Sequence, residues 1–193
     1  MSNNFFKKEE TLVILDWDDT LLPTSWFDYV DIEMEIVKNK IDLLDDLNCK
    51  FLDIILKNAF IIIVTNSTYS WFKMTSEKFL PKTLNYINDK NIKIISAREE
   101  NSMRFSDDIY MWKVSTFRDI LLRNNFNNII SIGDSLYERS ALFNLLNDFK
   151  KINVKNIKLK DNPSIDQLIT QLNVIIISIN DIYKKKINLD LRL

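Results

Sequence analysis

The sequence predicts a three-layer α/β protein, with a central and mainly parallel five-stranded sheet between two layers of helices. Apolar runs of strand length, rich in β-branched residues, alternate along the chain with stretches whose apolar residues recur every three or four positions. Most of these runs are apolar throughout, as expected for parallel strands that are buried on both faces. The predicted fold is therefore a Rossmann-like sandwich.

Five segments have the character of strands. They are residues 11–15, 60–65, 92–96, 129–133 and 152–159. Polar side chains follow the first, second and fourth of them directly. Because ligands of such sheets bind beyond the carboxyl ends of the strands, we expect these polar side chains to share one site.

Between the strands, helical spacing predicts helices at residues 41–58, 71–89, 109–123, 137–146 and 164–182, with Pro81 breaking or restarting the second. Ser164 caps the last helix, and Gln167 stands in the capping-box position. We expect a polar loop at 98–108, and a small flap or helical insert at about 21–40. No linker or repeat divides the 193 residues, so residues 1–193 are predicted to form one domain.

Composition narrows the class of protein. A content of 46% hydrophobic and 27% charged residues is typical of a globular protein, and the net charge of −1 gives no electrostatic reason to expect nucleic acid or an acidic membrane. The apolar runs are too short to span a bilayer, and no secretory signal pattern is evident. With Cys49 as the single cysteine, a cytoplasmic location is expected.

Two residue types are informative by their scarcity. The chain contains no histidine, which excludes His-based phosphatases, Ser-His-Asp hydrolases and ordinary zinc sites. It contains one glycine, which excludes a glycine-rich phosphate loop.

Three aspartates, Asp16, Asp18 and Asp19, follow the first strand within four positions. Carboxylates crowded at the end of a buried strand repel one another and lose hydration, so a cation or a catalytic role would account for them. Alternatively, one of them caps a helix and the others are solvated. An EF-hand is excluded because Leu21 and Phe27 stand where that loop needs glycine and glutamate.

Other polar residues offer matching chemistry. Thr65, followed by Asn66, can donate a hydrogen bond to a phosphate oxygen, although an N-cap role would also explain it. Lys113 lies among core residues of a predicted helix and is either a surface lysine or a positive charge aimed at the aspartates. Gly133 permits close backbone approach or an unusual dihedral angle beside Asp134. Oxygen ligands without histidine favour Mg²⁺ over zinc.

In chain order, DWDDT (16–20), Val64-Thr65, Lys113 and GDSLYE (133–138) resemble the motifs of the haloacid dehalogenase (HAD) superfamily of phosphohydrolases. The resemblance extends from residue 11 to about 159. It implies a HAD-like fold and a two-step phosphoryl transfer. Glu138 stands where aspartate is commoner, and Asp19 replaces a glycine that is frequent in the motif.

By this resemblance, Asp16 is the nucleophile and Asp18 the acid and base. Thr65, Asn66 and Lys113 bind the phosphoryl group. Asp16, the backbone carbonyl of Asp18 and Asp134 bind Mg²⁺. The supporting residues are Thr20, Gly133, Ser135 and Glu138.

The resemblance implies hydrolysis of a phosphate monoester, because family members without an acid at the position of Asp18 catalyse other reactions. The insertions at 21–59 and 66–112 are too short for a full cap domain. A site without a cap resembles the sites of relatives that act on macromolecules. We therefore expect a phosphorylated protein or small molecule as substrate, with nucleic acid less favoured and no membrane partner. The alternatives are a nucleotide or nucleic-acid end phosphatase, another phosphotransferase, and a binding scaffold without turnover.

Overall fold

The computed structural model describes residues 6–106 and 108–193. Residues 1–5 of the predicted domain and Asp107 of the expected polar loop lie outside the described residues. The described chain forms a single sheet with strand order β3-β2-β1-β4-β5-β6. Every neighbouring pair of strands is parallel. The predicted α/β fold class is confirmed.

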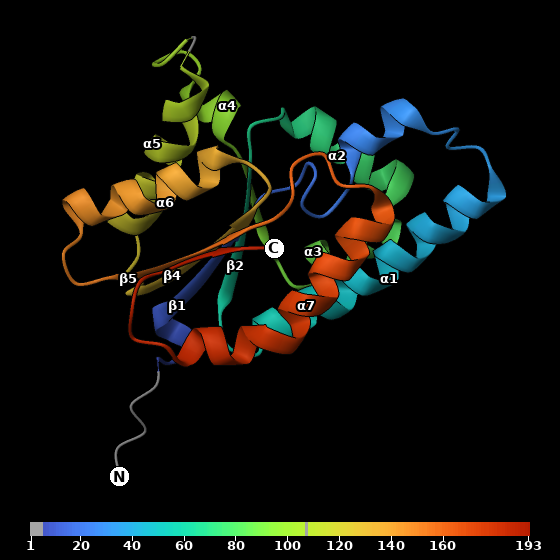
Figure 1. Ribbon diagram of the computed structural model, residues 1–193. Coiled ribbons are helices and arrows are strands. Elements are labelled where there is room, and N and C mark those ends of the chain that lie inside the picture. Colours follow the sequence, from blue (N-terminus) through green and yellow to red (C-terminus); the bar gives the residue numbers. More distant parts are fainter. Residues whose placement is uncertain (1–5, 107) are drawn as a thin grey trace.

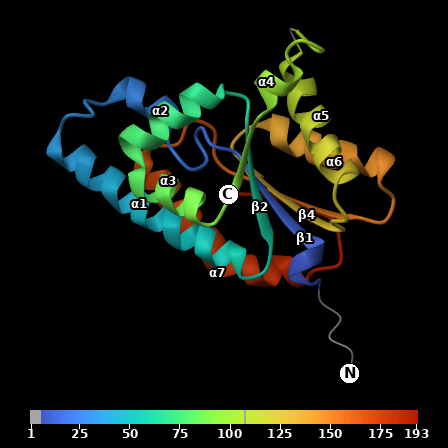
Figure 2. The ribbon, with the colours of Figure 1, turned by 180° about the vertical axis from the view of Figure 1, so that it is seen from behind.

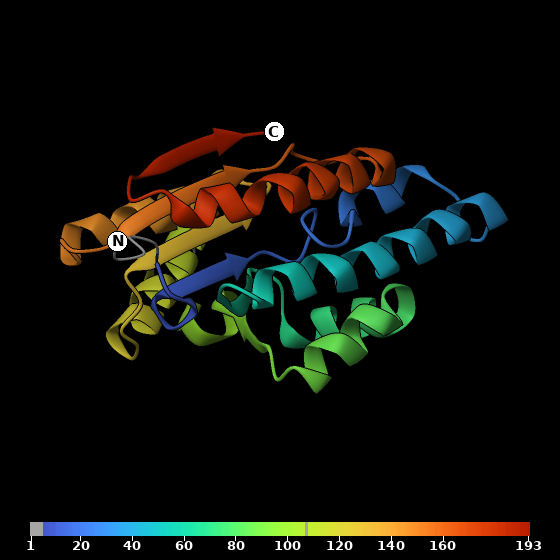
Figure 3. The ribbon, with the colours of Figure 1, turned by 90° about the horizontal axis from the view of Figure 1, so that it is seen from below.

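The strands are β1 (Thr11–Leu15), β2 (Phe60–Thr65), β3 (Lys93–Ser96), β4 (Asn128–Gly133), β5 (Asn153–Lys158) and β6 (Leu189–Arg192). The first five correspond to the predicted strands. The sixth was not predicted, and it lies at the edge of the sheet beside β5 (Figure 3). It has four residues that alternate between half-buried and exposed, so it carries none of the continuous apolar signal of the inner strands.

The helices are α1 (Glu35–Leu56), α2 (Tyr69–Phe79), α3 (Pro81–Asp89), α4 (Ala97–Asn101), α5 (Ile109–Leu122), α6 (Leu136–Asp148) and α7 (Ile165–Lys184). Figures 1 and 2 show α1, α2, α3 and α7 on one face of the sheet and α4, α5 and α6 on the other. Each face buries its own apolar cluster. In the part of the chain that the structure describes, no helix has the length and apolarity needed to cross a bilayer.

Two predicted boundaries were wrong. Helix α1 begins at Glu35, so the last six residues of the expected 21–40 insert form the first turns of the crossover helix. Val37 continues the buried stripe of that helix. The expected loop at 98–108 begins inside α4, because the Ser96 hydroxyl accepts a 3.1 Å hydrogen bond from the backbone N–H of Glu99 and caps that helix.

The insert between β1 and α1 is compact. It contains a 3-10 helix, Thr24–Tyr29, and within its fully described residues 16–34 there is no further strand or longer helix. Trp26 and Phe27 pack against the core, and the ring of Phe27 lies 4.5 Å from that of Phe79 between centroids. Tyr29 is 83% exposed. The insert therefore extends the core instead of forming a separate layer.

Candidate active site

The strand order reverses between β1 and β4, and Asp16 and Asp134 follow these two strands directly. The backbone N–H of Asp16 continues the sheet by donating to the carbonyl of Ile132 over 3.0 Å. In an open parallel sheet, the crevice at such a reversal is where ligands bind. The fold thus brings both aspartates to the expected binding edge.

A cavity of about 250 Å³ opens at this edge. It is lined by Asp16, Asp18, Asp19, Thr65, Asn66, Ser67, Ile109, Lys113, Asp134, Ser135, Tyr137 and Glu138. All the predicted site residues are among them except Thr20 and Gly133. Thr20 is fully buried, and its hydroxyl makes no hydrogen bond to the described residues. Side chains far apart in the sequence are therefore gathered as predicted.

Lys113 lies at the centre of the buried charges. Its ammonium is 2.8 Å from Asp16 Oδ1 and also pairs with Glu138 Oε1, and all three side chains are almost fully buried. Burial lowers the pKa of Lys113, but the charges of Asp16 and Glu138 outweigh this and raise it above its usual value. The lysine is thus held as a cation, and the surface alternative for Lys113 is wrong.

Glu138 is held from two sides. It accepts hydrogen bonds from the Ser135 backbone N–H (3.0 Å) and hydroxyl (2.5 Å), which closes a capping box at the start of α6. Burial raises the pKa of Glu138, but the charge of Lys113 and the hydrogen bonds to Lys113 and Ser135 together outweigh burial. The net pKa of Glu138 is therefore below its ordinary value. Glu138 is therefore a charged, fixed anchor for Lys113.

Asp16 is placed differently. Burial raises its pKa well above the usual range, with the charges of Glu138 and Asp134 adding to the rise and Lys113 opposing it. Its Oδ1 atom is buried and accepts no hydrogen bond of normal geometry, although Lys113 lies nearby. A further positive charge at this oxygen would stabilise the carboxylate.

Asp134 completes an acidic cluster that could hold a cation. Single oxygens of Asp16, Asp134 and Glu138 lie within 4.8 Å of one another. Burial, and then the charges of Glu138 and Asp19, raise the pKa of Asp134 to about 7, against a lowering effect of Lys113. An all-oxygen donor set, with an Asp16 oxygen that accepts no hydrogen bond of normal geometry, fits a hard cation. The Asp18 carboxylate is not in this cluster. The sequence analysis expected Asp18 to bind the cation through its backbone carbonyl, and this stays a prediction.

The carboxylate of Asp18 faces the segment between β2 and α2. Its Oδ2 accepts hydrogen bonds from Ser67 Oγ (2.7 Å) and Thr65 Oγ1 (3.4 Å), and its Oδ1 accepts one from Trp71 Nε1 (2.8 Å). Thr65 Oγ1 also accepts from the Ser67 backbone N–H over 2.9 Å. Asp18 is thus oriented by side chains from one neighbouring loop and helix.

Asp19, which received no role in the sequence analysis, supports the turn. It has a left-handed backbone with φ of 53°, a conformation that aspartate tolerates better than most residues. Its carboxylate accepts a 2.9 Å hydrogen bond from the Ser25 backbone N–H and another from the Ser25 hydroxyl. Burial raises the pKa of Asp19, against these hydrogen bonds. Asp19 therefore fixes the start of the insert.

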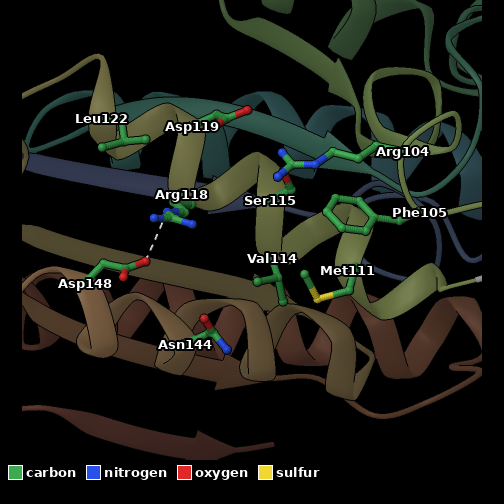
Figure 4. Close-up of a pocket in the computed structure, with 10 residues that line it drawn as sticks. All are labelled: Arg104, Phe105, Met111, Val114, Ser115, Arg118, Asp119, Leu122, Asn144 and Asp148. Carbon is green, nitrogen blue, oxygen red and sulfur yellow. Dashed lines mark ion pairs between the residues drawn. The ribbon is translucent and has the colours of Figure 1, made fainter.

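A larger cavity, of about 430 Å³, lies beside α5 and α6 (Figure 4). It is lined by helices and the loop before α5, not by the ends of strands. Arg104 and Arg118 are balanced there by Asp119 and Asp148, and Arg118 pairs with Asp148 at 3.1 Å. The Arg118 and Asp148 side chains are well exposed, whereas those of Asp16, Lys113 and Glu138 are buried, so the smaller cavity is the better candidate for chemistry.

Three site residues were missed by sequence reasoning. Ser67 and Trp71 bind Asp18, and Lys158 Nζ donates to the Asp134 backbone carbonyl over 2.5 Å. The first turn of a helix that follows a site strand lies near the binding edge, which was the available signal for Trp71. Lys158 lies near the end of a predicted strand, and that position also indicated that it lies near the binding edge.

Comparisons of this chain with protein-family models, with curated proteins and with solved structures found no match.

Proposed function

We propose that this protein is a Mg²⁺-dependent phosphatase of the HAD type, which hydrolyses a phosphate monoester through an aspartyl-phosphate intermediate. The observation that carries the proposal is the contact of one buried lysine, Lys113, with both Asp16 and Glu138. This contact fixes Asp16 beside a second carboxylate, Asp18, that faces the same cavity. A fixed nucleophile next to a separate proton donor suits two-step phosphoryl transfer.

In the first step, an oxygen of Asp16 attacks phosphorus, and the bond from phosphorus to the leaving oxygen breaks. Asp18 gives its proton to that oxygen, which leaves as an alcohol. In the second step, Asp18 takes a proton from water as the water oxygen attacks phosphorus. The bond to Asp16 then breaks, and inorganic phosphate and the free carboxylate are released.

Other residues bind the phosphoryl oxygens. Lys113 supplies a positive charge, and Thr65 and the neighbouring Asn66 lie on the same cavity wall. Asp16 and Asp134, with the Asp18 carbonyl, would hold Mg²⁺, while Ser135, Gly133 and Glu138 support that arrangement. When bound, the cation reduces repulsion between Asp16 and an anionic substrate and stabilises negative charge in the transition state.

The lining also bears on the substrate. Lys113 is the one cation among the twelve lining residues, and it is already paired with two carboxylates. A polyphosphate or a nucleic-acid end would find no second positive charge in this cavity. This favours a phosphorylated protein or small molecule over the alternative of a nucleotide or nucleic-acid end phosphatase.

Hydrolysis of an aryl phosphate tests the proposal. Activity is expected with Mg²⁺, and EDTA should abolish it. The substitution Asp16→Asn should lower kcat by about a thousandfold or more. Asp28→Asn, which changes an exposed aspartate of the insert, is the matched control and should leave kcat unchanged. Activity that survives Asp16→Asn, or no turnover of any phosphoester by the folded protein, contradicts the proposal; the second result favours a binding scaffold.

A further inference from the structure

The hydrogen bonds around Asp18 distinguish its two oxygens. Oδ2 accepts from both Ser67 and Thr65, whereas Oδ1 accepts from Trp71 alone. A carboxylate oxygen has two lone pairs, so Oδ1 keeps one that is available to a substrate. The indole N–H therefore orients the oxygen that is free to exchange a proton.

Helix α2, which carries Trp71, is fastened to the residue before Asp18. Trp17 is fully buried, its Nε1 donates to Thr75 Oγ1 over 3.0 Å, and its ring meets that of Phe72 edge to face at 4.6 Å. Two consecutive residues after β1 thus contact two consecutive residues of α2: Trp17 contacts Phe72, and Asp18 contacts Trp71. This double contact fixes the distance between the indole and the carboxylate.

The loop that carries Ser67 is fixed as well. Ser96 Oγ, at the end of β3, donates to the Ser67 backbone carbonyl over 2.7 Å. Thr65 makes the longest of the three bonds to Asp18, at 3.4 Å. If Thr65 donates to a phosphoryl oxygen instead, Ser67 and Trp71 are the two side chains that still hold Asp18.

We propose that Trp71 and Ser67 are positioning residues for proton transfer, and that they hold Asp18 so that Oδ1 meets the leaving oxygen of the substrate. This inference rests on the proposed phosphatase function. Trp71 is 39% exposed, so its indole N–H could be hydrated by solvent and does not need Asp18 as a partner. The bond between them serves the orientation of Asp18.

The test uses the dependence of rate on the leaving group. An alkyl phosphate needs a proton on its leaving oxygen, whereas a dinitrophenyl phosphate expels a stable anion without one. We expect Trp71→Phe, which removes the N–H, to lower kcat/KM for the alkyl phosphate by roughly tenfold or more. The rate of phosphorylation by the dinitrophenyl ester should change by less than about threefold, because general acid catalysis contributes little there.

Matched variants separate positioning from a structural effect. Tyr69→Phe removes a hydroxyl from an exposed ring on the same helix and should leave both rates unchanged. Ser67→Ala should repeat the selective loss, and Ser67→Thr, which keeps a hydroxyl, should restore the alkyl rate. Equal losses on both substrates in Trp71→Phe would overturn the inference while leaving the phosphatase function intact.

A second measurement does not need turnover. The chain has four tryptophans, so ¹⁵N-labelled protein gives four indole N–H signals, and the one missing in Trp71→Phe identifies Trp71. The substitution Asp18→Asn should shift that signal and leave the Trp112 signal, whose N–H donates to the Phe105 carbonyl, in place. A Trp71 signal unmoved by Asp18→Asn would contradict the inference whatever the enzyme's activity.

Discussion

Glu138 occupies the space that a side chain at residue 133 would need. A Cβ atom on Gly133 would lie 2.5 Å from Glu138 Cγ and 2.7 Å from Oε2, far inside van der Waals contact. Gly133 does not have a positive φ, so close approach, and not an unusual dihedral angle, explains the chain's single glycine. Since Glu138 pairs with Lys113, this contact shapes the charge cluster of the site.

Gly133→Ala should therefore displace Glu138 and, through it, Lys113. We expect a loss of about 1–3 kcal/mol in the free energy of unfolding, as for other overpacked interiors, and a fall in phosphatase kcat larger than tenfold. Denaturant unfolding and steady-state kinetics measure the two effects. Ser131→Ala is the matched control, because it changes a small buried residue of the same strand whose hydroxyl has no partner among the described residues. Wild-type kcat in Gly133→Ala would show that Glu138 does not position Lys113.

Removal of Lys113 should make stability depend more strongly on pH. Lys113 lowers the pKa of Glu138 and opposes the rise in the pKa of Asp16. In Lys113→Met both folded-state pKa values rise, so the folded protein binds more protons than the wild type does. The variant should lose about 3–5 kcal/mol at neutral pH, and less near pH 5, where the carboxyls can be protonated.

Urea unfolding in EDTA at the two pH values measures this difference. Lys93→Met, at an exposed lysine, should lose little at either pH. An equal loss for Lys113→Met at both values would mean that the lysine does not act through these carboxylates.

Asp19 should contribute through both its backbone and its carboxylate. Asp19→Ala places alanine at a φ of 53° and removes the acceptor for Ser25. We expect it to lower the free energy of unfolding by about 2–3 kcal/mol. Asp19→Asn keeps an oxygen acceptor and a residue that tolerates this conformation, so it should cost less than about 1 kcal/mol. Similar thermal midpoints for the two variants would rule out this role.

Lys155 should produce an alkaline rise in stability. The residue is fully buried, with Asn128 Oδ1 as a hydrogen-bond acceptor, and burial lowers its pKa to about 8 from 10.5. Between these values the unfolded chain binds more protons, so stability from this group increases as pH rises. From pH 8 to 10, Lys155→Met should show a smaller increase than the wild type, by up to about 3 kcal/mol. Parallel pH profiles of the two proteins in chemical unfolding would contradict this.

Sequence reasoning located most of the fold because the inner strands carry continuous apolar runs. Residues 11–15 and 60–65 were predicted to the residue, since each run ends at a polar side chain. Edge strand β6 was not predicted, because a partly exposed strand of four residues needs no continuous apolar run. Helix α4 was not predicted, because the charged residues after Ala97 indicate a polar loop. Ser96 and Glu99 nevertheless have the spacing of a helix cap.

The candidate site was predictable where residues end a strand, as Thr65 does, or directly follow one, as Asp16 and Asp134 do. The contacts of Trp71 were not, because its apolar ring at helical spacing indicates a core position, and only the packing of α2 on Trp17 turns its N–H toward Asp18. The role of Gly133 was also undecided, because sequence cannot distinguish close approach from a positive φ.

The most direct test of the account is to locate the phosphoryl group during turnover. Borohydride reduces an acyl phosphate to an alcohol, so quenching the enzyme with substrate and Mg²⁺ should convert Asp16 to homoserine, which peptide mass spectrometry detects. The account predicts this conversion at Asp16 alone, its absence in Asp16→Asn, and its absence in EDTA. Steady hydrolysis without homoserine at residue 16, or with the label on another carboxylate, would contradict it.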